Sequence, residues 1–150
     1  MRRFGERYVQ GAPYRDRPGA YGIIGDGAGR ILLAHSTGKD GGWLLPGGGV
    51  DPGEGPVAAL HREVMEETGW RIAPRRRLTV YQRYVFMPDY GWWARKVCHI
   101  YLARAVLPLR DPTEPDHTPI WLSADEAARR LTVGAEAHAL RTLIRSGVSF

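Results

Sequence analysis

The stretch that most constrains the fold is 56–68, where the sequence predicts a single amphipathic helix. Its first residue is a proline, which suits the first turn of a helix, and Gly69 stands just past its end, where glycine is favoured. Val57, Leu60 and Val64 recur at helical spacing, so one face of this helix can pack against a core. We therefore expect a helix held firmly against the rest of the domain.

Strand patterns precede and follow this helix. Alternating and β-branched runs predict strands over 20–24, 30–35, 77–87, 93–107 and 120–122, and capping and periodicity predict further helices over 124–131 and 134–145. Strands mixed with three helices indicate an α/β (or α+β) sandwich. The 150 residues suit one domain over 19–150, preceded by a polar arm, 1–18, that wraps the surface or frays.

Composition excludes several classes of protein. The chain has no run of about 18 apolar residues, so we expect no membrane-spanning helix. Its first residues lack the apolar core of a secretory signal, and Cys98 is the only cysteine, which rules out an intramolecular disulfide. These features favour a cytoplasmic protein.

Charge is distributed unevenly along the chain. The formal net charge is +5, but the segment 48–70 carries −4 and the remainder carries +9. An acidic focus in a basic body suits a site that holds metal cations while its surroundings attract a polyanion. The alternative is an arginine-rich composition without functional meaning.

Three glutamates of the predicted helix share one face. Glu63, Glu66 and Glu67 are spaced i, i+3 and i+4, so they lie within about 100° of arc. Like charges at this spacing destabilise a helix by a few tenths of a kcal/mol per pair, and the C-terminal half of a helix favours cations. A divalent cation such as Mg²⁺ or Mn²⁺, which prefers oxygen ligands, explains the arrangement; a solvated acidic face is the alternative.

The whole segment 48–70 resembles the Nudix box of the Nudix hydrolase (MutT-like) superfamily. In that pattern a glycine is followed after five residues by a glutamate, and after seven more by Arg-Glu, a bulky aliphatic residue, any residue, Glu-Glu, any residue and Gly. The matching residues are Gly48, Glu54, Arg62, Glu63, Val64, Glu66, Glu67 and Gly69, and Trp70 stands where a bulky aliphatic residue is usual.

The resemblance implies a Nudix-type α/β/α sandwich with a mixed sheet. It also implies a hydrolase that cleaves a nucleoside diphosphate linked to another moiety, with Mg²⁺ or Mn²⁺ as the cofactor. By motif position, Glu63, Glu66 and Glu67 would be metal ligands, and the backbone carbonyl of Gly47 a further one. Glu63 would also be the base for the attacking water, with Arg62 orienting it.

An acid outside the box is a further catalytic candidate. Related proteins often place one in the loop that here holds Asp111, Glu114 and Asp116, and we select Glu114; a solvated acidic loop is the alternative. His117, in the same loop, is the histidine to test.

Aromatic residues supply candidates for substrate binding. Trp43, Trp92 and Trp93 could stack on a nucleobase, although aromatic residues on strands usually belong to a core. Cys98 and His99 are neighbours on a predicted strand and point to opposite faces, which makes them a poor catalytic pair.

Several functions stay open. The substrate could be a nucleoside triphosphate, a nucleotide sugar, ADP-ribose, a dinucleoside polyphosphate or the 5′ end of an RNA. A non-catalytic nucleotide-binding module is the alternative from another class, but it would be expected to have lost box acids. We expect a small-molecule nucleotide or other phosphoanhydride as the partner, no membrane, no nucleic acid, and a homodimer.

Overall fold

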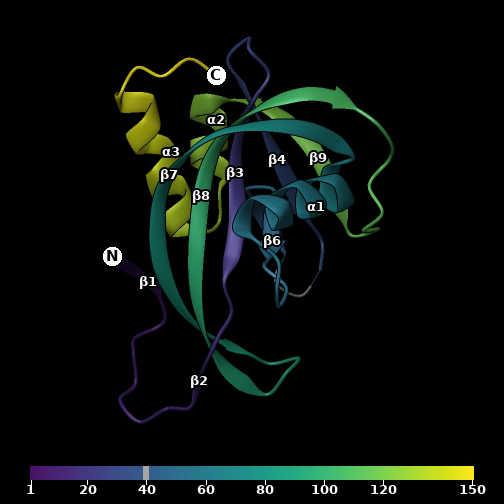
Figure 1. Ribbon diagram of the computed structural model, residues 1–150. Helices are drawn as coiled ribbons and strands as arrows, with labels where there is room; N and C mark the ends of the chain where they lie inside the picture. The colour runs from purple at the N-terminus through teal and green to yellow at the C-terminus, as the bar shows by residue number, and fades with distance from the viewer. Residues whose placement is uncertain (39–40) are drawn as a thin grey trace.

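A mixed β-sheet forms the centre of the molecule (Figure 1), and the computed structural model describes residues 1–38 and 41–150 of it. The strand order is β1-β7-β8-β3-β4-β5, with β2 beside β8, β6 beside β3 and β9 beside β4. The strands are β1 (Arg2–Gly5), β2 (Tyr14–Asp16), β3 (Gly19–Gly25), β4 (Arg30–Ser36), β5 (Gly42–Leu44), β6 (Gly47–Gly49), β7 (Trp70–Met87), β8 (Trp92–Pro108) and β9 (His117–Ser123).

Helices cover both faces of this sheet in the described part of the chain. Helix α1 (Pro56–Thr68) lies on one face, and α2 (Ala124–Arg130) and α3 (Gly134–Arg145) lie on the other (Figure 1). Successive strand residues point to opposite faces, so Ile23 joins the core under α3 while Ile24 joins the core under α1. The predicted sandwich with a mixed sheet is therefore confirmed. Within 1–38 and 41–150, no helix combines the length and the apolar character needed to cross a membrane.

The predicted helices agree closely with the structure, whereas the strands after α1 are longer than predicted. Strand β7 begins directly after Gly69, and β7 and β8 form one long antiparallel hairpin whose register shifts at three places. Such irregularities bend a strand and increase its twist. At the start of α2, the Ser123 hydroxyl accepts a hydrogen bond from the Glu126 N–H at 3.3 Å, as its capping position predicts.

The N-terminal arm is more ordered than the sequence indicates. Strand β1 pairs in parallel with β7, and β2 pairs in parallel with β8, so the arm extends the sheet instead of fraying. Asp16 accepts two hydrogen bonds from Arg95 at 2.7 and 2.8 Å, and the rings of Tyr14 and Tyr84 meet edge to face. Short polar strands of three or four residues carry too little periodicity to be recognised in sequence.

Strand β6 brings a run of glycines beneath α1. It pairs with β3 in antiparallel register, with Gly47 opposite Tyr21. Gly47 has a φ of 145°, and a Cβ atom there would lie 2.2 Å from the carbonyl oxygen of Ala20. Only glycine lets the backbone approach this closely, so the segment before the box has a fixed place next to the helix that carries the acids.

Candidate active site

Helix α1 holds the three box glutamates in fixed positions. Pro56 occupies its first turn, and Gly69 ends it in a left-handed conformation with φ 74°. Leu60 and Val64 are fully buried beneath the helix. The acids therefore project from a packed helix, as the sequence predicts, and their relative geometry is set by the core.

Glu67 is the most deeply buried of these acids. Its side chain is 8% exposed, and its Oε2 accepts a hydrogen bond from the Gly47 N–H at 3.0 Å. Burial raises the pKa of Glu67 to about 9; the hydrogen bond from Gly47 lowers this pKa, and the nearby carboxylates of Glu63 and Glu114 raise it. A buried carboxylate surrounded by other carboxylates is stable as an anion only when a cation compensates it.

Arg62 connects the loop before the helix to the acids on it. Its guanidinium donates to both carboxylate oxygens of Glu54 at 2.9 Å, to the carbonyl oxygen of Gly49 at 2.9 Å and to Glu63 at 3.0 Å. Hydrogen bonds from Arg62 hold the pKa of Glu54 at about 2. Glu54 and Arg62 form a bidentate pair that fixes the side chain of Glu63.

The position of Gly48, the first glycine of the box, requires a residue without a side chain. A Cβ atom on Gly48 would lie 2.5 Å from the carboxyl carbon of Glu63 and under 3 Å from both of its oxygens. Glu63 is half-buried here, and loss of water contact raises its pKa. Glycine at 48 therefore leaves room for the Glu63 carboxylate.

The loop after β8 brings Glu114 to the same site. The backbone N–H groups of Thr113 and Glu114 donate to the carbonyl oxygen of Glu66, at 2.8 and 3.3 Å. That carbonyl belongs to the last turn of α1, where the helix itself provides no partner. The loop thus caps the helix, and in doing so places an acid from outside the box beside the box acids.

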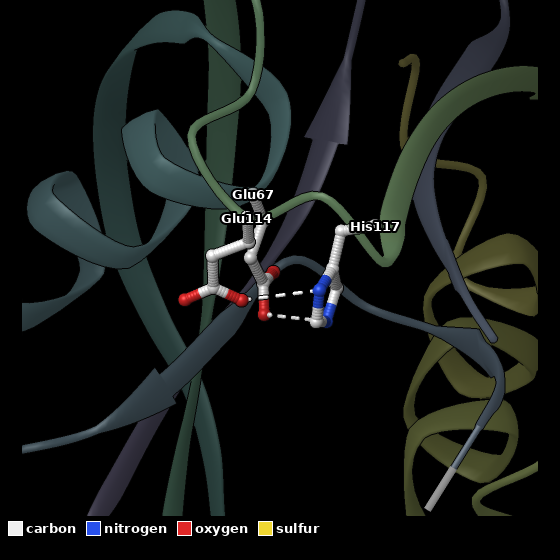
Figure 2. A group of neighbouring side chains, drawn as sticks. All are labelled: Glu67, Glu114 and His117. Carbon is white, nitrogen blue, oxygen red and sulfur yellow. Dashed lines mark ion pairs between the residues drawn. The ribbon is translucent and has the colours of Figure 1, made fainter. Parts of the chain in front are cut away.

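Two overlapping groups of side chains offer ligand atoms for a metal ion. Glu63, Glu66 and Glu114 form one, and Glu67, Glu114 and His117 form the other; within each group the ligand atoms lie within 4.8 Å of one another. Figure 2 shows the second group, in which His117 Nδ1 lies 3.0 Å from Glu114 and its Nε2 lies 3.5 Å from Glu67. Their oxygen-rich chemistry, and the burial of Glu67 beside other carboxylates, fit a bound divalent metal.

A cavity of about 370 Å³ opens next to Gly47. Its polar lining includes Tyr21, Lys96 and Glu136, and part of its apolar lining comes from the β7–β8 hairpin. Glu136 is buried and accepts a hydrogen bond from the Leu45 N–H at 2.9 Å; burial raises its pKa to about 7. A cavity of this size can hold one nucleoside-sized group.

The structure brings together most of the predicted site residues. Arg62, Glu63, Glu66, Glu67 and Glu114 gather around one end of α1, and Gly47 donates its N–H to Glu67.

The three predicted tryptophans lie elsewhere. Trp43 packs against His35 and Arg130, and Trp93 packs against Tyr14 and Phe86. The ring of Trp92 lies within 6 Å of the guanidiniums of Arg15 and Arg17. None of them is among the described residues that line the cavity. Their predicted role in substrate binding stays a prediction.

Glu136 is the residue of this region that the sequence interpretation missed. A signal for it exists, because Glu136, Leu140 and Leu143 are spaced i, i+4 and i+7 and so share the buried face of α3. An acid on an apolar face is uncommon and points to a specific partner.

Comparisons with known proteins identify the family to which the chain belongs. The family model of the NUDIX domain matches residues 15–143. A MutT NUDIX hydrolase from Burkholderia pseudomallei, known from a crystal structure, is 31% identical; the match covers 85% of this chain and 97% of that one, with a TM-score of 0.61. The chain therefore belongs to the Nudix family, as its box predicts.

Curated relatives match over shorter segments. A CMP-5'-(N-acetyl-N-hydroxy-3-aminopropyl)phosphonate hydrolase from Streptomyces rubellomurinus is 40% identical over 95 residues, which are 62% of this chain and 43% of that protein. An RNA pyrophosphohydrolase from Teredinibacter turnerae is 38% identical over 66 residues, 44% of this chain and 39% of that one. The matched segments thus span less than half of either relative, and the two names describe different substrates.

Proposed function

We propose that this Nudix domain is a metal-dependent pyrophosphohydrolase that cleaves the phosphoanhydride of a nucleoside diphosphate linked to another moiety. One observation carries the proposal: Glu114, from a distant loop, completes two ligand groups with Glu63 and Glu66 and with Glu67 and His117. Like charges gathered at a half-buried place cost free energy unless they hold cations. A complete acid set also argues against a non-catalytic binding module.

The acids of α1 would hold the metal, for which we propose Mg²⁺ or Mn²⁺. Glu63, Glu66 and Glu67 would supply carboxylate oxygens and Gly47 its carbonyl oxygen, with Glu114 and His117 completing the ligand set. When bound, the metal neutralises phosphate charge and lowers the pKa of a water ligand. The protein's part is to fix these oxygens, through the core beneath α1 and the loop that caps it.

Glu63 is our proposed general base for the attacking water. Arg62 donates to its Oε1 at 3.0 Å and so orients the carboxylate, while partial burial raises the pKa of Glu63 and makes it a better proton acceptor. Water attacks one phosphorus of the pyrophosphate link, Glu63 takes the proton, and the bond from that phosphorus to the bridging oxygen breaks. The alternative base is Glu114, whose carboxylate lies 3.0 Å from His117.

The cavity beside Gly47 is the proposed place for the base or sugar of the substrate. It lies directly next to the residue that holds Glu67, so a group bound there would place its phosphates over the acids. The opposed charges of Lys96 and Glu136 offer both a donor and an acceptor to such a group.

Hydrolysis at the 5′ end of an RNA is the second candidate. One observation favours it, the 38% identity with an RNA pyrophosphohydrolase over 66 residues. The excess of arginine outside the box is compatible with an RNA chain that continues away from the site.

A substrate panel tests the proposal. Purified protein is incubated with nucleoside triphosphates, nucleotide sugars, ADP-ribose, dinucleoside polyphosphates and a 5′-triphosphorylated RNA, with Mg²⁺ or Mn²⁺, and products are separated by chromatography. We expect metal-dependent release of a nucleoside monophosphate from at least one nucleotide. Preferred cleavage of the RNA would select the second candidate, and no cleavage of any compound with either metal would refute both.

A further inference from the structure

A second cavity, of about 410 Å³, lies on the α3 side of the sheet and apart from the acids of α1. Residues of β1, β7 and α3 line it, and Figure 1 shows α3 lying beside these two strands. Strand β1 begins at Arg2, opposite Tyr81. Among the described residues, the part of β7 before Tyr81 therefore pairs with β8 alone. The cavity occupies the space between this open stretch of β7 and α3.

Two guanidinium groups lie at this cavity, and its described lining contains no acidic side chain. Arg2, Arg76 and His138 are in its lining, and no aspartate or glutamate is among the described residues that line it. Arg2 Nη1 donates a hydrogen bond to His138 Nε2 at 2.5 Å. Neither Arg2 nor Arg76 forms an ion pair within residues 1–38 and 41–150, so both guanidiniums keep donors for a ligand.

The remaining walls of the cavity are apolar or carry hydroxyl groups. Phe4 and Tyr81 meet edge to face on one side, with their ring centroids 5.5 Å apart. Leu78, Ala139 and Leu143 add aliphatic surface, and Thr142 and Ser146 add hydroxyls. A cavity of a few hundred Å³ that combines aromatic walls with a few convergent polar groups has the general form of a small-molecule site.

We propose that this cavity is a second binding site, which takes a small anion with a flat aromatic body. The aromatic body would lie against Phe4 and Tyr81, and the anionic group, a phosphate, sulfonate or carboxylate, would meet the guanidiniums of Arg2 and Arg76. The proposal does not depend on the proposed hydrolase activity, because none of these residues belongs to the site on α1.

Fluorescence of 8-anilinonaphthalene-1-sulfonate, an aromatic sulfonate, tests the site directly. The titration uses the full chain in the presence of a chelator, so that no metal recruits the probe to the acids of α1. We expect saturable binding of one probe molecule per chain. The double variant Arg2→Ala/Arg76→Ala should weaken binding at least about 10-fold, because charge-assisted hydrogen bonds are lost.

Two further variants make the result specific. The matched control Arg3→Ala/Arg77→Ala removes the same charge from neighbouring positions that do not line the cavity, and it should change affinity less than about twofold. Ala139→Phe fills the cavity and keeps every charge, and it should also abolish binding; thermal melting confirms that each variant is folded. Absence of saturable binding, full binding by Ala139→Phe, or equal losses in the two arginine pairs would overturn the proposal.

Competition identifies the source of the anion. A nucleoside monophosphate and an aromatic carboxylate, indole-3-carboxylate, are each tested for displacement of the probe, with inorganic phosphate as the control without a ring. Displacement by either aromatic anion supports the proposal and selects its ligand. Equal displacement by inorganic phosphate would show that the aromatic walls contribute nothing, and would overturn it.

Discussion

Two buried glutamates on opposite faces of the sheet show how the same side chain acquires different properties. Glu67 of α1 and Glu136 of α3 each accept a hydrogen bond from one short stretch of backbone, at Gly47 and Leu45. Burial raises the pKa of both, to about 9 for Glu67 and about 7 for Glu136.

The difference comes from the neighbours of each carboxylate. Glu67 faces further acids, Glu63 and Glu114, which raise its pKa. Glu136 faces Arg83 and Lys96, which lower its pKa. A carboxylate buried beside like charges is suited to bind a metal ion. A carboxylate buried beside opposite charges is suited to bind a polar ligand group or to make a structural contact.

Exchange of each glutamate for glutamine should separate the two roles, and the largest effect is expected at Glu67. Glu67→Gln removes a metal ligand at the centre of the site, so we expect kcat to fall about a thousand-fold and Mn²⁺ binding, measured by calorimetry, to weaken strongly. Glu136→Gln is the matched control and should leave Mn²⁺ binding unchanged. Equal metal affinity in the Glu67 variant and the wild type would remove Glu67 from the ligand set.

Part of the dependence of stability on pH should come from Glu136, in a defined direction. Its folded pKa of about 7 lies above the ordinary 4.5, so the folded state holds the proton more tightly. The stabilisation that comes from this proton is complete below pH 4.5, decreases as the pH rises to 7 and is lost above pH 7. The free energy of unfolding falls by about 3 kcal/mol in total. Denaturant unfolding of wild type and Glu136→Gln between pH 4.5 and 8 measures it. A constant difference between the two free energies of unfolding across this range would contradict the prediction.

A single methyl group added at position 48 should displace a carboxylate of the α1 site and leave the residues on the α3 face of the sheet unchanged. In Gly48→Ala the new Cβ would lie 2.5 Å from the carboxyl carbon of Glu63, so the carboxylate must move. We expect kcat to fall about 10- to 100-fold, the range found when the support of a metal ligand is altered. Gly49→Ala is the control, because its Cβ would meet nothing closer than 3.9 Å, and similar losses in both variants would argue against a specific effect on Glu63.

The smallest effect is expected for Trp93. Its ring packs against Tyr14 of β2 and Phe86 of β7, and Trp93 does not line the cavity beside Gly47. Trp93→Ala should therefore change kcat/KM less than about threefold, while Lys96→Ala, within the cavity, should raise KM more. A larger increase in KM for Trp93→Ala than for Lys96→Ala would support the substrate-binding role predicted from the sequence.

The α1 side could be predicted in detail because its signals are local. The helix bounds, the packed stripe and the spacing of Glu63, Glu66 and Glu67 all lie within one short segment, and the helix begins and ends where Pro56 and Gly69 indicate. The sequence narrows the outside acid to three candidates in one loop, and Glu114 is the one that the structure places in both groups of potential ligands.

The α3 side depends on long-range contacts that no local pattern encodes. Glu136 reaches Leu45, which is 91 residues away in the chain, and its partners Arg83 and Lys96 come from the long hairpin. The parallel pairing of β1 and β2 likewise depends on strands far along the chain. Local propensity cannot report such pairings, because their stability comes from the partner strand.

The close packing at Gly69 has a consequence for the evolution of this fold. A Cβ atom there would lie 1.7 Å from the carbonyl oxygen of Arg110, so the turn that ends α1 and the loop that carries Glu114 occupy adjoining space. The acidic motif of α1 is consequently not sufficient by itself. If it were transferred to another protein scaffold, it would lose Glu114, the acid that this junction places beside it. Insertions and deletions between β8 and β9 should be confined to positions that keep this junction intact, whatever substrate a descendant of this chain comes to prefer.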